Sequence, residues 1–289
     1  MKFLFTGASG FVGRQLWATG FFPAARWLCR SACPEESHTT AISQYSFSEL
    51  QPYLREADVV VHLAAVTRDS RWAILNNANV LLTKNLSEWS QSVNPKIRLI
   101  SLSSDLAGCL SSPYGRSKHE AENFLSKTGG DRVSLRASMI AGERIQGPAS
   151  SLLTLKRLSR LPIVPILGNG RFIIRPLWIH DFAEIIVRLG TRRGIAEDCG
   201  IWSFSGDAVS YKDLIDYWRR ESAQLSVCVP FPIGLLSGIG NLLRRFNPAT
   251  TFPVDFLESI IASDQNPPPD IFDHLKVRKT PWRIVADKI

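Results

Sequence analysis

Residues 2–6, Lys2-Phe3-Leu4-Phe5-Thr6, run directly into Gly7-Ala8-Ser9-Gly10-Phe11-Val12-Gly13. The first stretch is a short, largely apolar run that predicts a buried parallel strand. The second is a G-x-x-G-x-x-G loop that opens a helix, and its glycines let the backbone turn tightly and approach a pyrophosphate. Free amides and the positive helix end stabilise such a charge. The loop therefore predicts a dinucleotide site that includes Gly7, Ser9, Gly10, Phe11, Val12 and Gly13.

Apolar runs and helical patterns alternate along the first half of the chain, which predicts right-handed βαβ units and an α/β fold with a doubly wound parallel sheet. Strands are expected at 26–30, 58–65, 97–102, 133–137 and 201–204. Helices are expected at 12–20, 76–90, 114–126, 152–160, 181–189 and 211–220, and residues 233–246 are an apolar stretch that can pack in the core or touch a membrane surface. The predicted organisation is a dinucleotide-binding domain over residues 1–140, to which the chain returns at about 171–200. Residues 141–170 and 201–289 are expected to form a smaller C-terminal substrate lobe.

Composition narrows the class of protein. With 289 residues, 45% of them hydrophobic, the chain can bury a full core. The net charge of +8 favours acidic partners, but the basic residues are dispersed, so we expect a cleft for phosphorylated small molecules and no nucleic acid. The five cysteines form no C-x-x-C pair, so no metal site is expected. No signal peptide or transmembrane segment is recognised, which predicts a cytoplasmic protein.

The segment Tyr114-Gly115-Arg116-Ser117-Lys118 places a phenol and an ammonium on one face of a helix. A phenol, with a pKa of about 10, acts as an acid or base near neutrality only when that pKa is lowered. A neighbouring cation lowers it by favouring the phenolate. This spacing is common on surface helices, but here it follows Ser101, Ser103 and Ser104 at the end of a predicted strand. The ligand crevice of a parallel sheet lies at such strand ends, where a hydroxyl can donate to a carbonyl or simply satisfy the backbone.

Together these residues resemble the short-chain dehydrogenase/reductase superfamily, in particular its extended branch, the NAD-dependent epimerase/dehydratase family. The resemblance covers about residues 1–205, and its motifs follow the family's order. They are the glycine loop, Asp58-Val59-Val60-Val61-His62-Leu63-Ala64-Ala65, Asn79-Val80, the serine followed by Y-G-R-S-K, and Leu135-Arg136-Ala137. The resemblance implies a Rossmann fold whose cofactor also contacts Leu63, Ala64, Ala65 and Asn79.

The same resemblance assigns the chemistry. It implies that Tyr114 is the proton donor or acceptor and that Lys118 lowers the pKa of Tyr114 and binds the nicotinamide ribose. It also implies that Ser103 is the third catalytic residue, with Ser104 as the alternative. Arg136 and Arg175 are candidate substrate-binding residues that would clamp a diphosphate, although either can instead be a structural ion-pair partner.

The choice of cofactor is partly readable from Arg30-Ser31, at the end of the second predicted strand. NAD-specific sites place an acidic residue there to accept from the ribose hydroxyls. An arginine suits a 2′-phosphate, so NADP is favoured over NAD. The alternative is a solvated arginine with NAD tolerated.

Three features depart from the sugar-nucleotide pattern of the family. The segment between Ser103 and Tyr114 is short, Leu106-Ala107-Gly108 replaces the usual V-Y-G, and the stretch 175–181 is shortened as in atypical members. Two functions therefore remain. One is an NAD(P)-dependent 4-keto reductase or 4-epimerase acting on a nucleotide diphosphate sugar, which the intact Ser103, Tyr114 and Lys118 favour. The other is a non-catalytic NADPH-binding protein that resembles the complex I accessory subunit and acts in assembly or sensing. Analogy with extended-branch enzymes suggests a homodimer.

Overall fold

A seven-stranded parallel sheet forms the centre of the computed structural model, which describes residues 1–30, 39–67, 69–110, 112–143, 151–222, 226–234 and 268–289. The strand order is β11-β6-β5-β4-β1-β2-β3. The strands are β1 (Phe3–Thr6), β2 (Arg26–Cys29), β3 (Thr39–Ala41), β4 (Val59–His62), β5 (Arg98–Ser104), β6 (Arg132–Ala137) and β11 (Gly200–Phe204). The chain order reverses on the two sides of β1, as in a doubly wound sheet. The predicted fold class is confirmed.

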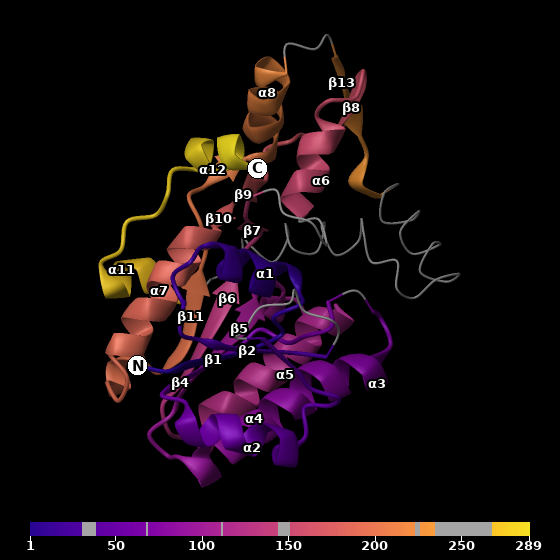
Figure 1. The fold of residues 1–289 in the computed structure, drawn as a ribbon. Helices are drawn as coiled ribbons and strands as arrows, with labels where there is room; N and C mark the ends of the chain where they lie inside the picture. Colours follow the sequence, from indigo (N-terminus) through magenta and orange to yellow (C-terminus); the bar gives the residue numbers. More distant parts are fainter. Residues whose placement is uncertain (31–38, 68, 111, 144–150, 223–225, 235–267) are drawn as a thin grey trace.

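Helices cover both faces of the sheet (Figure 1). On one face, α2 (Phe47–Glu56), α4 (Leu82–Val93) and α5 (Pro113–Thr128) bury a cluster that includes Leu4, Val60 and Leu99. On the other face, α1 (Phe11–Ala18) and α7 (Ile179–Thr191) pack over Phe5 and Val61. Neighbouring residues of one strand thus enter opposite clusters. This explains why these strands are continuous apolar runs without alternating polar residues.

A second lobe lies beyond the carboxyl edge of the sheet, in the upper part of Figure 1. Its strand pairs are β7 (Ile140–Ala141) with β10 (Leu177–Trp178), β8 (Ile163–Leu167) with β13 (Val227–Phe231), and β9 (Ile173–Ile174) with β12 (Val209–Ser210). Its helices are α6 (Ser151–Leu158), α8 (Tyr211–Glu221) and α12 (Trp282–Lys288). The lobe shares one hydrophobic cluster with the sheet, so the two parts do not have separate cores.

The structure redraws one predicted boundary. The substrate lobe was expected to resume at residue 201, but residues 201–204 pair with β6 and belong to the central sheet. The helix α11 (Ile271–Leu275) also packs on this sheet, because the Phe272 ring stacks on Phe204 at a centroid distance of 5.5 Å. The reason is geometric: β11 is the edge strand, and the C-terminal residues cover it.

Two predicted elements differ in extent. The helix expected at 76–90 begins earlier in the structure, with α3 (Trp72–Leu75), and continues through a π-helical segment (Asn76–Leu81) into α4. The strand expected at 58–65 ends at His62, so Leu63, Ala64 and Ala65 lie beyond the last strand residue at the carboxyl edge. Ser31 and the apolar stretch 233–246 lie outside the described residues, apart from residues 233 and 234.

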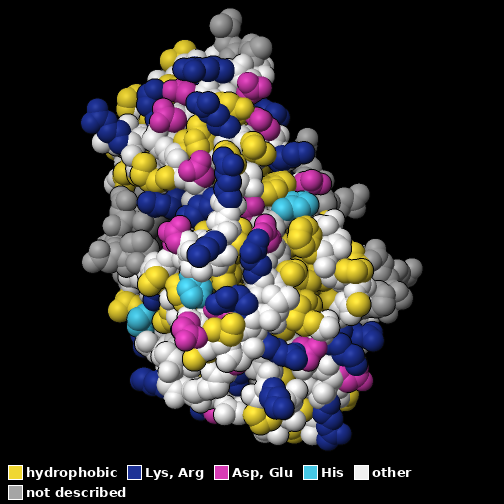
Figure 2. Space-filling model, turned by 90° about the vertical axis from the view of Figure 1, so that its left-hand side faces the viewer, with side chains coloured by type: hydrophobic (Ala, Val, Ile, Leu, Met, Phe, Trp, Pro, Cys, Tyr) yellow, Lys and Arg dark blue, Asp and Glu magenta, His cyan; other side chains and the backbone are white. Residues whose placement is uncertain are grey.

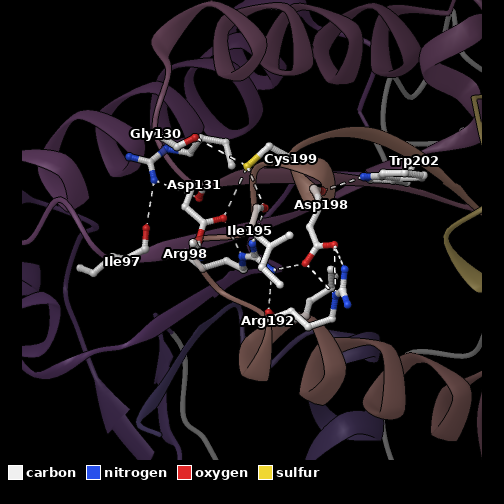
Figure 3. Close-up of polar contacts among 12 residues, drawn as sticks. Ile97, Arg98, Gly130, Asp131, Arg192, Ile195, Asp198, Cys199 and Trp202 are labelled. Carbon is white, nitrogen blue, oxygen red and sulfur yellow. Dashed lines mark hydrogen bonds and ion pairs between the residues drawn. The ribbon is translucent and has the colours of Figure 1, made fainter. Parts of the chain in front are cut away.

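A buried charge cluster ties together the amino edge of the sheet (Figure 3). The fully buried Arg98 guanidinium binds Asp131 Oδ1 at 2.6 Å, Asp198 Oδ2 at 3.0 Å and the Leu189 carbonyl oxygen at 2.6 Å. The Asp198 carboxylate also contacts the Arg192 guanidinium and the His274 ring. Arg98 is the first residue of β5, so this cluster stabilises the edge opposite the ligand crevice.

Two further findings concern the described residues alone. None of their helices is long and apolar enough to cross a membrane. Within the same ranges, no group of three or more His, Cys, Asp or Glu side chains is placed to hold a metal ion. On the face drawn in Figure 2, basic side chains are interspersed with acidic ones.

Candidate active site

The glycine loop, residues 7–13, joins β1 to α1 at the carboxyl edge of the sheet. Gly7 has a φ of +79°, and a Cβ atom on it would lie 2.6 Å from the Ala64 amide nitrogen. A Cβ on Gly13 would lie 2.5 Å from the Gly7 carbonyl oxygen. Both positions therefore need glycine. Gly10 is the N-cap of α1 and places no side chain there, so the positive end of the helix, at Phe11 and Val12, fits an anionic group.

The chain that leaves β4 forms the neighbouring wall. The Leu63 amide donates to the Thr6 carbonyl oxygen at 3.2 Å, and the Ala64 amide donates to Thr6 Oγ1 at 3.4 Å. These bonds hold residues 63 and 64 beside the end of β1, next to Gly7. The glycine loop and the predicted cofactor residues Leu63 and Ala64 therefore lie together at the position where the strand order reverses, as expected for a dinucleotide crevice.

Tyr114 and Lys118 lie one turn apart near the start of α5. Ser112 caps this helix by accepting a hydrogen bond from the Gly115 amide at 3.3 Å. The Lys118 ammonium is buried and donates to the Leu102 carbonyl oxygen of β5 at 2.8 Å. Burial lowers the pKa of Lys118 to about 8. Tyr114 is half-buried, so the helix presents a phenol next to a cation that is fixed on the sheet.

The two candidate serines at the end of β5 make different bonds. Ser103 is buried, and its hydroxyl donates to Glu122 Oε1 on α5 at 2.6 Å. Ser104 is half-buried and its Oγ accepts a hydrogen bond from the Leu106 amide at 3.2 Å, a contact that leaves the serine's own hydrogen for another acceptor. A hydroxyl that polarises a carbonyl must donate its hydrogen, so this geometry favours Ser104, the alternative of the two.

Asn79 connects three parts of the site. Its amide oxygen accepts from the Val66 amide at 2.8 Å, while its amide nitrogen donates to the Val66 carbonyl at 2.9 Å and to Ser117 Oγ at 2.9 Å. Ser117 in turn donates to the carbonyl oxygen of Tyr114 at 2.7 Å. The buried Asn79 thus joins the segment after β4 to the first turn of α5, which places the walls of the crevice relative to Tyr114.

Arg136 forms an ion pair with Glu122. Its guanidinium binds both carboxylate oxygens of Glu122, with Nη2 2.7 Å from Oε2 and Nε 2.9 Å from Oε1. This contact is the structural alternative considered for Arg136, and a contact with a diphosphate remains a prediction. Glu122 is itself buried and holds Ser103 and Arg136 against α5.

Arg175 is half-buried beside Asp105, the first residue of a 3-10 turn after β5. Burial raises the pKa of Asp105 to about 7, and the charges of Arg175 and Arg136 only partly oppose this effect. Ser205, just after β11, donates to Asp105 Oδ2 at 3.5 Å. Arg175 thus lies at the same edge of the sheet as the serines, and its contact with a substrate remains a prediction.

Several of these polar residues were not singled out from the sequence. Glu122 lies four residues after Lys118, a helical spacing that could have revealed it. Ser117 and Asp105 adjoin predicted site residues. The fourth is Tyr45, whose hydroxyl contacts the glycine loop and for which the sequence gives no local signal.

Comparisons with known proteins identify the family and the fold. The family model "NAD dependent epimerase/dehydratase family" matches residues 3–198. No curated protein sequence matches the chain. Similar solved structures include UDP-glucuronic acid 4-epimerase from Bacillus cereus in complex with NAD, at 21% identity and a TM-score of 0.64, covering 80% of this chain and 88% of that one. Another is UDP-N-acetylglucosamine 4-epimerase from Bacillus cereus, at 19% identity and a TM-score of 0.64, covering 80% of this chain and 85% of that one.

A third similar structure is UDP-glucose 4-epimerase from Thermotoga maritima with UDP-glucose. It has 17% identity and a TM-score of 0.64, covering 80% of this chain and 86% of that one. At these identities the structures establish a shared fold.

Proposed function

Because the chain belongs to the NAD dependent epimerase/dehydratase family, we propose that it is an enzyme that binds a nicotinamide dinucleotide and acts on a nucleotide diphosphate sugar. The reaction is hydride transfer at a hydroxyl or ketone carbon, as in 4-epimerisation or 4-keto reduction. One observation supports this proposal above the others. Tyr114 lies on α5 one turn from Lys118, whose ammonium is fixed at the carboxyl end of β5.

The residues of the crevice have separate roles in this proposal. The amides that open α1 bind the pyrophosphate, and Gly7 and Gly13 give the loop the close turn that this needs. Tyr114 exchanges a proton with the sugar oxygen, Lys118 favours the phenolate and binds a ribose hydroxyl, and a serine at the end of β5 donates to the same sugar oxygen. When bound, the coenzyme supplies the hydride acceptor and donor.

The proposed substrate class rests on charge and on similar folds. The chain is basic, and Arg175 lies at the same edge of the sheet as the serines, which suits a diphosphate. Similar structures are of epimerases that act on UDP-glucuronic acid, UDP-N-acetylglucosamine or UDP-glucose. These are the substrates we would test first.

For the coenzyme we propose NADP in preference to NAD, although the similar structures with a named coenzyme contain NAD. The support is Arg30, which follows β2 directly and is exposed. At this position an acidic side chain would accept from the ribose hydroxyls of NAD, whereas a guanidinium matches a 2′-phosphate.

A direct test begins with the nucleotides that copurify with the protein, identified by mass spectrometry. The purified protein is then incubated with each of the three UDP-sugars, and the sugar carbons are followed by NMR. Conversion without net coenzyme consumption would indicate an epimerase, and stoichiometric NADPH oxidation with a 4-keto sugar would indicate a reductase. Bound NADPH with no conversion of any substrate would contradict the enzyme and support the non-catalytic binding protein.

A further inference from the structure

Tyr45 links three elements at the end of the crevice away from Tyr114. Its phenol oxygen accepts a hydrogen bond from the Gly7 amide at 2.9 Å, and its hydroxyl donates to the Leu28 carbonyl oxygen at 3.4 Å. The guanidinium carbon of Arg30 lies 6.0 Å from the centre of the Tyr45 ring. The first glycine of the loop and the arginine after β2 are thus joined through one side chain.

The ring of Tyr45 is held in place. It packs against the hydrophobic cluster that contains Leu4, Leu28 and Val60, beneath β1, β2 and β4. The hydroxyl contacts Gly7, which follows β1, and Leu28, near the end of β2. A side chain anchored in this way presents its hydroxyl at a fixed position, so little ordering is left to a ligand that binds it.

The location of this hydroxyl indicates what it would meet. Gly7 follows β1 and Arg30 follows β2, and β1 and β2 are neighbours in the sheet. In a doubly wound dinucleotide fold, the residue that follows β2 recognises the 2′ position of the adenosine ribose. Tyr45 Oη is bonded to the Gly7 amide on one side, and the Tyr45 ring is flanked by Arg30 on the other.

We propose that Tyr45 is a coenzyme-specificity residue, whose hydroxyl acts with the Arg30 guanidinium to bind the 2′-phosphate of an adenosine ribose. This inference rests on the proposed function, because it needs a dinucleotide in the crevice. The Gly7 amide uses a lone pair of the phenol oxygen, which leaves the hydroxyl hydrogen to donate. Its bond to Leu28 is long and therefore weak, and a phosphate oxygen is a stronger acceptor.

The charges support a phosphate over a hydroxyl at this place. Arg30 carries a full positive charge, and Tyr45 is a neutral donor. A phosphomonoester can accept from both at once. A bare 2′-hydroxyl gains less because a guanidinium has no acceptor to offer it. Tyr45 also holds its ring beneath the guanidinium, so it positions Arg30 as well as donating a hydrogen bond.

The experiment uses two nucleotides that carry only the adenosine half, 2′,5′-ADP and 5′-ADP, titrated calorimetrically into the full chain. Tyr45→Phe keeps the ring and removes the hydroxyl. It should weaken the affinity for 2′,5′-ADP by about tenfold and leave the affinity for 5′-ADP within about twofold. The reason is that only 2′,5′-ADP carries the charged 2′-phosphate to which the hydroxyl would donate. Arg30→Met should have the same selectivity, and the double variant should lose less than the product of the two because the residues act together.

Tyr53→Phe is the matched control, because Tyr53 lies on α2 and packs on the same hydrophobic cluster. It should bind both nucleotides as the unsubstituted chain does. Thermal denaturation establishes that each variant is folded. Hydrogen exchange of the unsubstituted chain gives a readout independent of any substitution: 2′,5′-ADP should protect the amides near residues 7 and 45 more strongly than 5′-ADP does.

The outcomes separate this inference from the proposed function. Equal loss of both nucleotides in Tyr45→Phe, or equal protection by both, would overturn the inference and leave Tyr45 as a support of the glycine loop. Tighter binding of 5′-ADP by Tyr45→Phe would overturn it as well, because the hydroxyl would then obstruct the ribose. If the unsubstituted chain bound neither nucleotide nor NADH nor NADPH, the proposed function itself would fail.

Discussion

Ser103 and Glu122 share a hydrogen bond of 2.6 Å, and both side chains are buried. Glu122 also forms the ion pair with Arg136, so one carboxylate joins β5, β6 and α5. The hydrogen of Ser103 is therefore engaged within the protein. We therefore propose Ser104, whose hydroxyl hydrogen is not used in its bond with Leu106, as the serine that donates to the substrate.

Alanine substitutions of the two serines should have different effects. Ser104→Ala should lower kcat by about 10²-fold, since it removes a donor to the sugar oxygen, and should lower the free energy of unfolding by about 1 kcal/mol because the Leu106 amide loses its acceptor. Ser103→Ala should lower the free energy of unfolding by about 1–3 kcal/mol, because Glu122 loses a buried donor, and should largely retain kcat. Steady-state kinetics and urea denaturation measure the two effects. The reverse pattern would assign the catalytic hydroxyl to Ser103, as the resemblance to the family implies.

Tyr114→Phe should remove turnover while preserving the coenzyme site. The loss expected is about 10²–10⁴-fold in kcat, the usual contribution of a positioned acid or base. Coenzyme affinity, measured by fluorescence titration, should be nearly unchanged because the ring remains. Tyr217→Phe is the control, since Tyr217 bonds to Asp287 on α12. Full activity of Tyr114→Phe would show that the proton donor is another group.

His62 should make the protein sensitive to acid. It is buried between the hydroxyls of Thr6 and Thr83, at 2.8 and 3.1 Å, and burial lowers its pKa to about 3. In the unfolded chain His62 binds a proton near pH 6.5, whereas in the folded chain it does so only near pH 3. The contribution of the neutral His62 to the free energy of unfolding is therefore complete above pH 6.5 and decreases as the pH falls toward 3. The slope contributed by this one group is about 1.4 kcal/mol per pH unit.

Replacing His62 with Gln should flatten this part of the stability profile, measured by urea denaturation at several pH values between 3 and 7. Gln can still bond to both threonines but does not titrate. His274→Gln serves as the control at a partly exposed histidine. An unchanged slope in the His62 variant would mean that carboxylates dominate the acid transition.

Arg98→Leu should destabilise the chain strongly. It leaves Asp198 fully buried with one partner fewer, and breaking a buried ion pair costs about 3–5 kcal/mol. Arg188→Leu is the matched comparison, because Arg188 pairs with Glu184 on the exposed side of α7 and its removal should have a small effect. The free energy of unfolding measures both. Equal effects would show that solvent screens the Arg98 cluster as it screens a surface pair.

The sequence predicts the local parts of this molecule well. These parts depend on residues close in the chain, where backbone periodicity fixes the geometry. They are the glycine loop, the first βαβ units and the spacing of Tyr114 and Lys118. Longer contacts leave no such pattern. The Gly7–Tyr45 bond spans 38 residues and the Arg98–Asp198 pair spans 100, so neither could be found by spacing.

The type of a residue does not by itself show which partner its side chain binds. An arginine near the carboxyl end of a strand can clamp a diphosphate or pair with a carboxylate, and the residue itself does not distinguish the two. For Arg136 the deciding partner is Glu122, which reaches it from a different element. The same holds for the two serines, because their hydrogen bonds depend on how α5 and the turn after β5 pack against the strand.

The bond between Lys118 and the Leu102 carbonyl has a thermodynamic consequence. A lysine side chain loses about 1.5–2 kcal/mol of rotamer freedom when it is ordered. Here the ammonium is already immobilised on a main-chain oxygen of β5. That entropy is lost when the chain folds, so the proposed ribose ligand would meet a preorganised cation, and its affinity would not be reduced by the ordering of a long, flexible side chain.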